Sequence, residues 1–301
     1  MAGLSAHRLA FFEQKAWTWA LCVLLFSAKS SGAEGYIDLR FDRVENGAFA
    51  PVPGAPQVLV QLPSSPSPGP VHLVLHFHGH SGCIEVIARA GPTPCADKGS
   101  PRQGWNLFGA HAASRTRSWL ILPQLAFLER NGSPGRLGEP GRARRLIEEV
   151  IQGVVQRGYW PHPVEVASLT ITAHSGGFEA ARAVIRHGGV EHWLKHLVLF
   201  DALYAGVDDF GRWAAASRDR SLIIITGRSG TPAALSQVFV SRYQSVLGDR
   251  LVPPESASLE KIAQGQVVLL RTTTSHRNIP IQFLGPVLER LLRPQTPPQK
   301  P

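Results

Sequence analysis

The sequence lacks the features of several protein classes. The apolar run at residues 16–28 has only 13 residues, which is too short to span a bilayer comfortably. The arginines are scattered, with the densest group at Arg142, Arg144 and Arg145, and they lack the interleaved aromatic residues of a nucleic-acid-binding module. No internal repeat is present. These absences argue against a membrane-spanning protein, a nucleic-acid-binding protein and a repeat array.

The N-terminus has the pattern of a secretory signal peptide. Arg8 and Lys15 precede the apolar run, and small residues ending at Ala33 follow it. We predict that residues 1–33 are a signal peptide and that the mature protein is secreted or periplasmic; an uncleaved anchor is the alternative. Cys22 follows a leucine, where a lipoprotein signal needs a small residue, so we expect no lipid anchor.

Cleavage after Ala33 leaves two of the three cysteines and a basic protein. Cys83 and Cys95 lie twelve positions apart, and in an oxidising compartment they are expected to form one disulfide; two free buried thiols are the alternative. Residues 1–33 carry three basic and one acidic side chain, so their removal lowers the formal net charge from +9 to +7. That charge favours association with anionic envelope polymers.

The chain between residues 34 and 293 alternates strand and helix patterns. Such alternation predicts a single α/β domain with a mostly parallel central sheet and helices on both faces. The tail, residues 294–301, is predicted to be disordered. We predict strands at 36–44, 57–62, 71–77, 119–123, 169–172, 196–200, 222–226 and 267–271, and helices at 105–115, 142–157, 178–185, 233–247 and 280–292.

The stretch 168–185 has the pattern of a nucleophile elbow, with Ser175 at the apex of a tight turn between a strand and a helix. The turn needs small residues on both sides, because larger side chains would collide with the adjoining strand and helix. Ala173 and Gly177 fill these places. The alternative is an ordinary loop in which the serine only caps the helix.

Ser175, Asp201 and His276 each follow a predicted strand, and functional groups of parallel sheets gather at the carboxyl ends of the strands. We predict that Ser175 is the nucleophile, that His276 takes its proton, and that Asp201 orients His276. The turn after strand 222–226 contains no carboxylate, and Asp208 and Asp209 are alternatives to Asp201 as the acid. His174 is the weaker rival for the base, since its side chain should point away from the hydroxyl.

An oxyanion hole needs backbone N–H groups aimed at the developing charge. We predict one from Gly176 and the other from Gly79 or His80, in the loop after strand 71–77. His76, His78 and His80 also form an alternating row that could bind a metal. The acidic and later histidine ligands of metallohydrolase patterns are not evident, so we expect neither a metal nor an organic cofactor.

Short motifs recur after the predicted strands: HFHGH (76–80), Pro123-Gln124, HSGG (174–177), FDALY (200–204) and His276 before Ile279-Pro280. With these motifs the chain resembles the α/β-hydrolase superfamily over about Tyr36–Leu292, and a little-characterised group of secreted bacterial serine hydrolases within it. The resemblance implies hydrolysis of a small-molecule or polymer-linked carboxylic ester, or less readily an amide, through an acyl-enzyme. The sequence departs from the superfamily pattern at Ala173, in place of the first elbow glycine, and at Arg228-Ser229, where an acid often lies.

A rival hypothesis is a non-catalytic binding protein on a degenerate hydrolase scaffold, holding envelope polysaccharide, because fold does not imply activity. The substrate is not predictable, since loops 84–104, 124–141 and 202–220 shape the cleft. Aromatic side chains that could line it are Trp105, Phe127, Tyr204 and Trp213. The oligomeric state is equally open.

Overall fold

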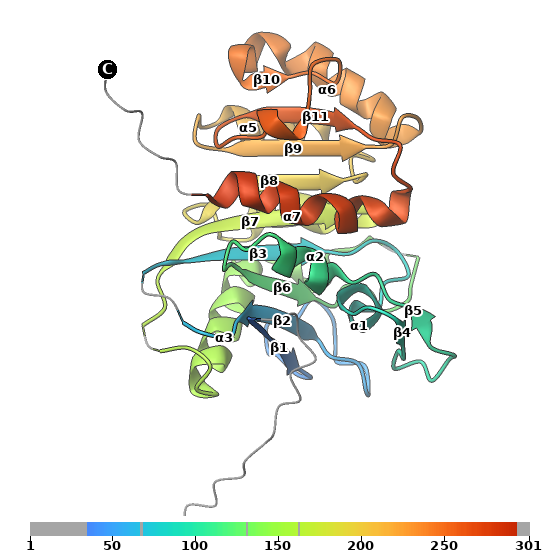
Figure 1. Cartoon of the computed structure of the whole chain (residues 1–301), viewed down its shortest axis with the longest axis vertical. Helices are drawn as coiled ribbons and strands as arrows, with labels where there is room; N and C mark the ends of the chain where they lie inside the picture. The colour runs from blue at the N-terminus through green and yellow to red at the C-terminus, as the bar shows by residue number, and fades with distance from the viewer. Residues whose placement is uncertain (1–34, 67–68, 131, 162, 294–301) are drawn as a thin grey trace, which may run out of the picture. The chain divides into compact units, whose positions relative to one another are not determined.

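Nine strands form one sheet in the computed structural model, in the order β1-β2-β6-β3-β7-β8-β9-β11-β10 (Figure 1). The structure describes residues 35–66, 69–130, 132–161 and 163–293. Strand β2 pairs antiparallel with β1 and β6, and the other pairs of this sheet are parallel. The strands are β1 (Tyr36–Phe41), β2 (Val58–Pro63), β3 (Val71–Phe77), β6 (Trp119–Pro123), β7 (Val166–His174), β8 (Leu194–Phe200), β9 (Ser221–Thr226), β10 (Leu251–Val252) and β11 (Val267–Arg271).

Helices cover both faces of the sheet, as predicted. Helices α1 (Ile84–Ala88), α2 (Leu107–Ala113) and α7 (Ile279–Leu292) pack on one face, and α2 and α7 cross in front of the sheet in Figure 1. The other face carries α3 (Arg142–Gln156), α4 (Phe178–His187), α5 (Val207–Ala215) and α6 (Thr231–Leu247). Shorter elements are β4 (Pro92–Thr93), β5 (Arg102–Gln103), η1 (Gly135–Gly138), η2 (Ser175–Gly177), η3 (Gly248–Arg250), η4 (Leu259–Lys261) and η5 (His276–Asn278).

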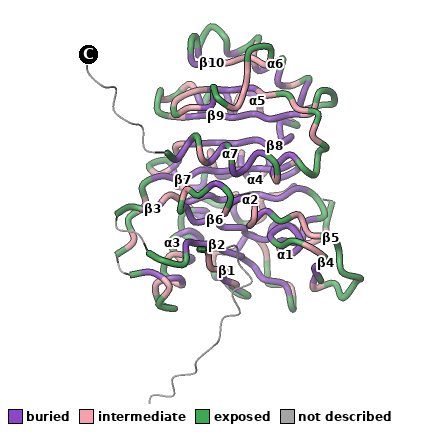
Figure 2. Tube along the Cα trace, in the orientation of Figure 1, coloured by how far each residue is buried: buried purple, intermediate pink, exposed green. Residues whose placement is uncertain are grey.

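The apolar pattern explains these positions. The central strands are buried on both faces (Figure 2), which suits their runs of aliphatic residues such as LIIIT in β9. Helix α3 buries Leu146, Val150 and Val154 on one stripe. Each such side chain contributes about 1.5–3 kcal/mol when it leaves water. The sheet is therefore held between two apolar cores, one under each helical layer.

Strands β3, β6 and β11 have the predicted bounds. Helices α1 and α5 and the β4–β5 hairpin were not predicted, and they lie in segments whose conformation the sequence pattern did not specify. The predicted signal peptide, residues 1–33, and the tail, residues 294–301, lie outside the described residues. Within the described part of the chain, no helix is both long and apolar enough to cross a membrane.

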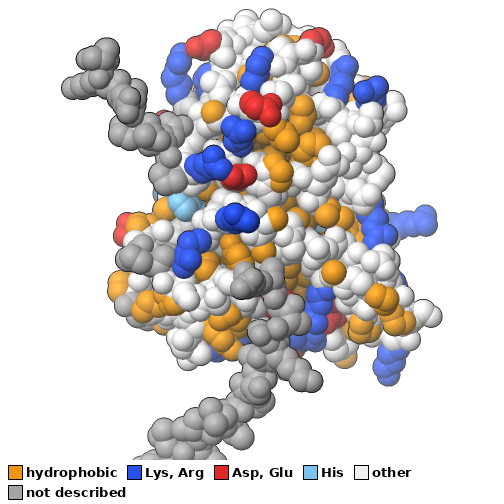
Figure 3. Space-filling view, viewed as in Figure 1, with side chains coloured by type: hydrophobic (Ala, Val, Ile, Leu, Met, Phe, Trp, Pro, Cys, Tyr) orange, Lys and Arg blue, Asp and Glu red, His pale blue; other side chains and the backbone are white. Residues whose placement is uncertain are grey.

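Basic side chains are spread over the surface. On the face drawn in Figure 3, Lys and Arg alternate with apolar and uncharged side chains, and acidic groups are fewer. The basic side chains on this face are dispersed, as the scatter of arginines along the sequence indicates.

Candidate active site

The strand–turn–helix predicted around Ser175 is present. Strand β7 ends at His174, Ser175 adopts a left-handed φ of 52°, and helical turns begin at once. Non-glycine residues rarely adopt this conformation, and such strained positions cluster at functional sites. A Cβ added to Gly177 would lie 2.3 Å from the carbonyl oxygen of Phe77 on β3. The small residue is therefore required by the neighbouring strand.

Asp201 and His276 meet at the carboxyl edge of the sheet. The Nδ1 of His276 donates to Oδ2 of Asp201 at 2.6 Å, and the backbone N–H of Gly227 donates to Oδ1 at 3.2 Å. Burial raises the pKa of Asp201, but the hydrogen bonds from His276 and Gly227 outweigh it, so the pKa lies below its ordinary value. Asp201 is therefore a carboxylate at neutral pH. Its backbone also has a left-handed φ, of 46°.

Tyr204 and His174 lie beside this pair. Burial and the charge of Asp201 raise the pKa of Tyr204, and its interaction with the side chain of Ser175 lowers that pKa in part. Tyr204 is therefore close to both the serine and the carboxylate. On the other side, Nε2 of His174 donates to the backbone carbonyl of His276 at 3.1 Å. The structure thus brings all three predicted residues to one edge of the sheet.

The predicted oxyanion loop lies against the elbow. A Cβ on Gly79 would fall 2.7 Å from the Cβ of Ser175, and one on Gly176 would fall 2.3 Å from the ring of His80. Within the described part of the chain, the N–H groups of Gly79 and His80 donate to no backbone carbonyl. Gly176 lies in the first helical turn, where N–H groups have no partner within the helix. These donors are the ones expected to hold an oxyanion.

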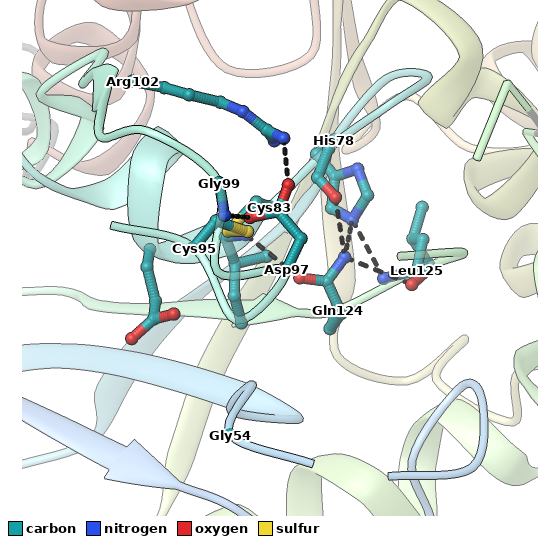
Figure 4. The surroundings of a disulfide bond; sticks show 12 residues. Gly54, His78, Cys83, Cys95, Asp97, Gly99, Arg102, Gln124 and Leu125 are labelled. Atoms are coloured by element: carbon teal, nitrogen blue, oxygen red, sulfur yellow. Dashed lines mark hydrogen bonds and ion pairs between the residues drawn. A yellow bond between two sulfur atoms is a disulfide. The ribbon is translucent and has the colours of Figure 1, made fainter. Parts of the chain in front are cut away.

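His78 and Gln124 hold this loop in place (Figure 4). The Nε2 of His78 accepts from the backbone N–H of Leu125 at 2.9 Å and lies 3.0 Å from the amide nitrogen of Gln124. The Oε1 of Gln124 accepts from the backbone N–H of Ile84 at 3.0 Å. Because Nε2 accepts, Nδ1 carries the proton and donates to the carbonyl of Gly79 at 2.7 Å. Burial lowers the pKa of His78 to about 4, which keeps this arrangement neutral.

The alternative acids have other partners. Asp209 accepts from Arg182 and Arg186 at 2.6–3.0 Å, and Asp208 accepts from Arg242 at 2.7 Å. Both are on α5, where their negative charges favour the helix N-terminus. Asp201 is the carboxylate that contacts His276.

His174, the alternative to His276 as the base, is buried. It is 2 % exposed, and its ring packs against those of His276 and Trp105, with centroids 4.5 and 5.3 Å away. Burial, with contributions from His276 and His76, lowers its pKa to about 3. His174 is therefore a neutral donor that holds the backbone of His276.

The three alternating histidines, His76, His78 and His80, each contact a different part of the protein. His76 pairs with Thr172 at 2.8 Å, His78 braces the loop, and the ring of His80 lies beside Gly176. Among the described residues, no group of three or more His, Cys, Asp and Glu side chains is arranged to hold a metal ion.

Three functional contacts were missed from the sequence. Tyr204 and Gln124 belong to quoted motifs, FDALY and Pro123-Gln124, but Tyr204 was considered only as a lining of the cleft and Gln124 was given no role. Gly227 supplies an N–H to Asp201 from the turn that lacks a carboxylate. That turn therefore supports Asp201, the predicted acid at the end of the preceding strand. Of the suggested cleft aromatics, Trp213 is 8 % exposed in the core, whereas Tyr204 is 37 % exposed.

The predicted disulfide joins Cys83 to Cys95 (Figure 4). It begins directly after the oxyanion loop, and both cysteines are buried with Val86. A cavity of about 160 Å³ lies beside the bond and reaches Gly79 and His80.

The sheet order, the helical layers and the placement of the turns are those of the α/β-hydrolase fold. The chain is similar in structure to the feruloyl esterase module from Clostridium thermocellum complexed with sinapinate, with a TM-score of 0.51, 10% identity, and 85% of this chain and 87% of that chain covered. It also matches an S-formylglutathione hydrolase from Agrobacterium tumefaciens, with a TM-score of 0.49, 11% identity, and 85% and 95% covered. At such identities the likeness shows the fold alone. No protein-family model and no curated protein matches the sequence.

Proposed function

We propose that this protein is a secreted serine hydrolase that cleaves a carboxylic ester, or less readily an amide, through an acyl-enzyme. The observation that carries the proposal is the 2.6 Å hydrogen bond between His276 and Asp201 at the edge where Ser175 lies in its strained turn. An ionised carboxylate on a histidine, at the same edge as a half-buried serine hydroxyl, is the arrangement that activates a weak nucleophile. The known esterases that share the fold support ester hydrolysis in general terms.

In this mechanism Ser175 attacks the ester carbonyl while Nε2 of His276 takes the hydroxyl proton. Asp201 fixes the proton of His276 on Nδ1 and stabilises the imidazolium that forms. The N–H groups of Gly79 or His80 and of Gly176 bind the oxyanion. The imidazolium then protonates the leaving alcohol. Water, deprotonated by the same histidine, hydrolyses the acyl-serine and regenerates the hydroxyl.

The test is labelling with a fluorophosphonate probe, because only an activated serine reacts quickly with it, together with turnover of phenyl acetate. The protein should be labelled on Ser175 and should hydrolyse the ester. Ser175→Ala should lose both properties while its melting temperature changes little, since the serine side chain supports no core contact. Ser241→Ala, on exposed α6, is the matched control and should behave as the parent protein. Rapid labelling that persists in Ser175→Ala would refute the assignment. Absent labelling would favour the non-catalytic binding protein.

Export is part of the proposal. The Cys83–Cys95 disulfide supports it, because such bonds persist in oxidising compartments. Expression of the full chain should yield a product in the periplasm or medium whose N-terminus, determined by mass spectrometry, is residue 34. The formal charge of +7 on that product would favour salt-sensitive association with anionic envelope polymers.

A further inference from the structure

The cavity beside the oxyanion loop lies where part of a substrate would lie. Its volume is about 160 Å³, close to the roughly 150 Å³ that accepts a benzene ring. One wall is the loop itself, residues 79–82. Because Gly79 is in contact distance of Ser175, a group in this cavity is adjacent to a carbonyl bound at the serine.

The opposite wall is basic and aromatic. It consists of Arg102 and Gln103 from β5, Trp105, and Arg277, which follows His276 directly. Of the described residues that line this cavity, none is acidic. The electrostatic environment of the cavity is therefore positive.

The two arginines are not equivalent. Arg102 forms an ion pair with Asp97 (Figure 4), so a carboxylate already neutralises its charge. Arg277 donates to the backbone carbonyl of Gln103 and lies over the ring of Trp105, 5.4 Å from the centroid. It takes part in none of the ion pairs found among the described residues. Its guanidinium is thus oriented by a carbonyl and a ring but keeps an uncompensated charge.

Trp105 fixes the position of that charge relative to the reacting groups. Its ring packs edge-on against His174, which in turn holds the backbone of His276. A guanidinium seated on an aromatic face presents its edge as a rigid fork, a geometry that suits bidentate binding of a carboxylate or another oxyanion. The side chain is preorganised for an anion at a fixed place beside the serine.

We propose that this cavity binds an anionic group of the substrate through Arg277, so that the preferred substrates are esters carrying a carboxylate, or a similar oxyanion, on a ring-sized group next to the scissile bond. This inference rests on the proposed serine hydrolase activity. It names the substrate class of the same site.

Two pairs of esters test the inference, each pair differing only in a carboxylate against a neutral carboxamide. The first pair, 4-acetoxybenzoate and 4-acetoxybenzamide, places the charge on the alcohol side. The second, 4-nitrophenyl 4-carboxybenzoate and 4-nitrophenyl 4-carbamoylbenzoate, places it on the acyl side. In at least one pair the charged ester should have a kcat/KM about tenfold higher or more, equivalent to about 1.4 kcal/mol. Because Arg277 is exposed, this ratio should decline as salt is added.

Variants identify the source of the preference. Arg277→Gln should lower the charged-to-neutral ratio about tenfold, and Arg277→Lys, which keeps the charge but not the fork, should lie between. Arg218→Gln is the matched control. Arg218 lines a separate cavity with His72 and Lys195, at the amino ends of the strands, so removal of its charge should leave the ratio unchanged.

Equal or faster hydrolysis of the neutral ester in both pairs would overturn the inference. So would an Arg277→Gln variant that slows both members of a pair equally, since that is the behaviour of a structural role. If phenyl acetate is hydrolysed and Ser175 is labelled while these preferences are absent, only the inference fails. If neither reaction occurs, the proposed function fails, and the inference with it.

Discussion

Five buried histidines should make the folded protein sensitive to mild acid. Burial is the main cause that lowers the pKa of His76, His111 and His174 to about 3, and that of His78 and His196 to about 4. In an unfolded chain each would have a pKa of about 6.5. The unfolded state therefore binds protons over a range in which the folded state does not.

The sign and size of the effect follow from this difference. Well above pH 6.5 the histidines are neutral in both states and the free energy of unfolding does not depend on them. As the pH falls below 6.5, the unfolded chain is favoured, and the loss levels off only near the folded pKa values. Between pH 6 and pH 5 the five residues together lower the free energy of unfolding by about 5–6 kcal/mol. That is comparable with the whole stability of a typical domain, about 5–15 kcal/mol.

Other groups change this window little. The pKa of His72 is also lowered by burial and adds to the loss, whereas the raised pKa of Asp38 opposes it. The lowered carboxyl pKa values, such as that of Asp201, act only at lower pH. The range from pH 6.5 to pH 5 therefore reports mainly on the histidines.

Urea unfolding at pH 7.5, 6 and 5, followed by tryptophan fluorescence, measures the effect. His111→Gln removes one titrating group away from the candidate active site, where His111 contacts Gln61 and Ser118. Whatever the absolute stability of this variant, its free energy of unfolding should fall between pH 6 and pH 5 by about 1 kcal/mol less than that of the parent protein. His187→Gln, at an exposed histidine, should retain the parent's pH dependence. A parent protein whose free energy of unfolding changes by less than about 2 kcal/mol over this interval would refute the reasoning.

Two further variants test the site and its supporting loop. Asp201→Asn removes the carboxylate that accepts from His276 and should lower kcat by about 10³–10⁴-fold. The control Asp208→Asn, at a residue paired with an arginine, should retain activity. Similar rates in the two variants would contradict the assignment of Asp201. Replacing Cys83 and Cys95 together with serine should lower the free energy of unfolding in urea by about 3 kcal/mol at pH 7.5, and an unchanged midpoint would show that the bond constrains little.

The sequence pattern predicted secondary structure well where a short continuous segment is fully buried. Runs such as VHLVLHF and WLILP leave few choices but a buried strand, and β3 and β6 have the predicted bounds. The positions after these strands were then predictable as one edge of the sheet, because parallel strands end together. The three residues brought together there, Ser175, Asp201 and His276, follow from that rule.

The partners of these residues were not predictable in the same way. Gly227 contacts Asp201 across 26 positions, and His174 contacts His276 across 102. No periodicity encodes such contacts, since they depend on how the loops pack. Helix α5 was missed for a related reason: it lies in the 202–220 loop, and its acidic first turn is neutralised by arginines from α4 and α6.

The contact between His78 and Gln124 anchors the oxyanion loop independently of the β4–β5 segment that lies beside it. Both ends of the oxyanion loop are tied to the end of β6, through Leu125 on one side and Ile84 on the other. The β4–β5 excursion that brings Arg102 and Gln103 to the cavity starts only after this anchorage. A different excursion between α1 and α2 would therefore change the lining of the cavity and the support that Gln103 gives to Arg277, while the oxyanion loop stays anchored at the end of β6.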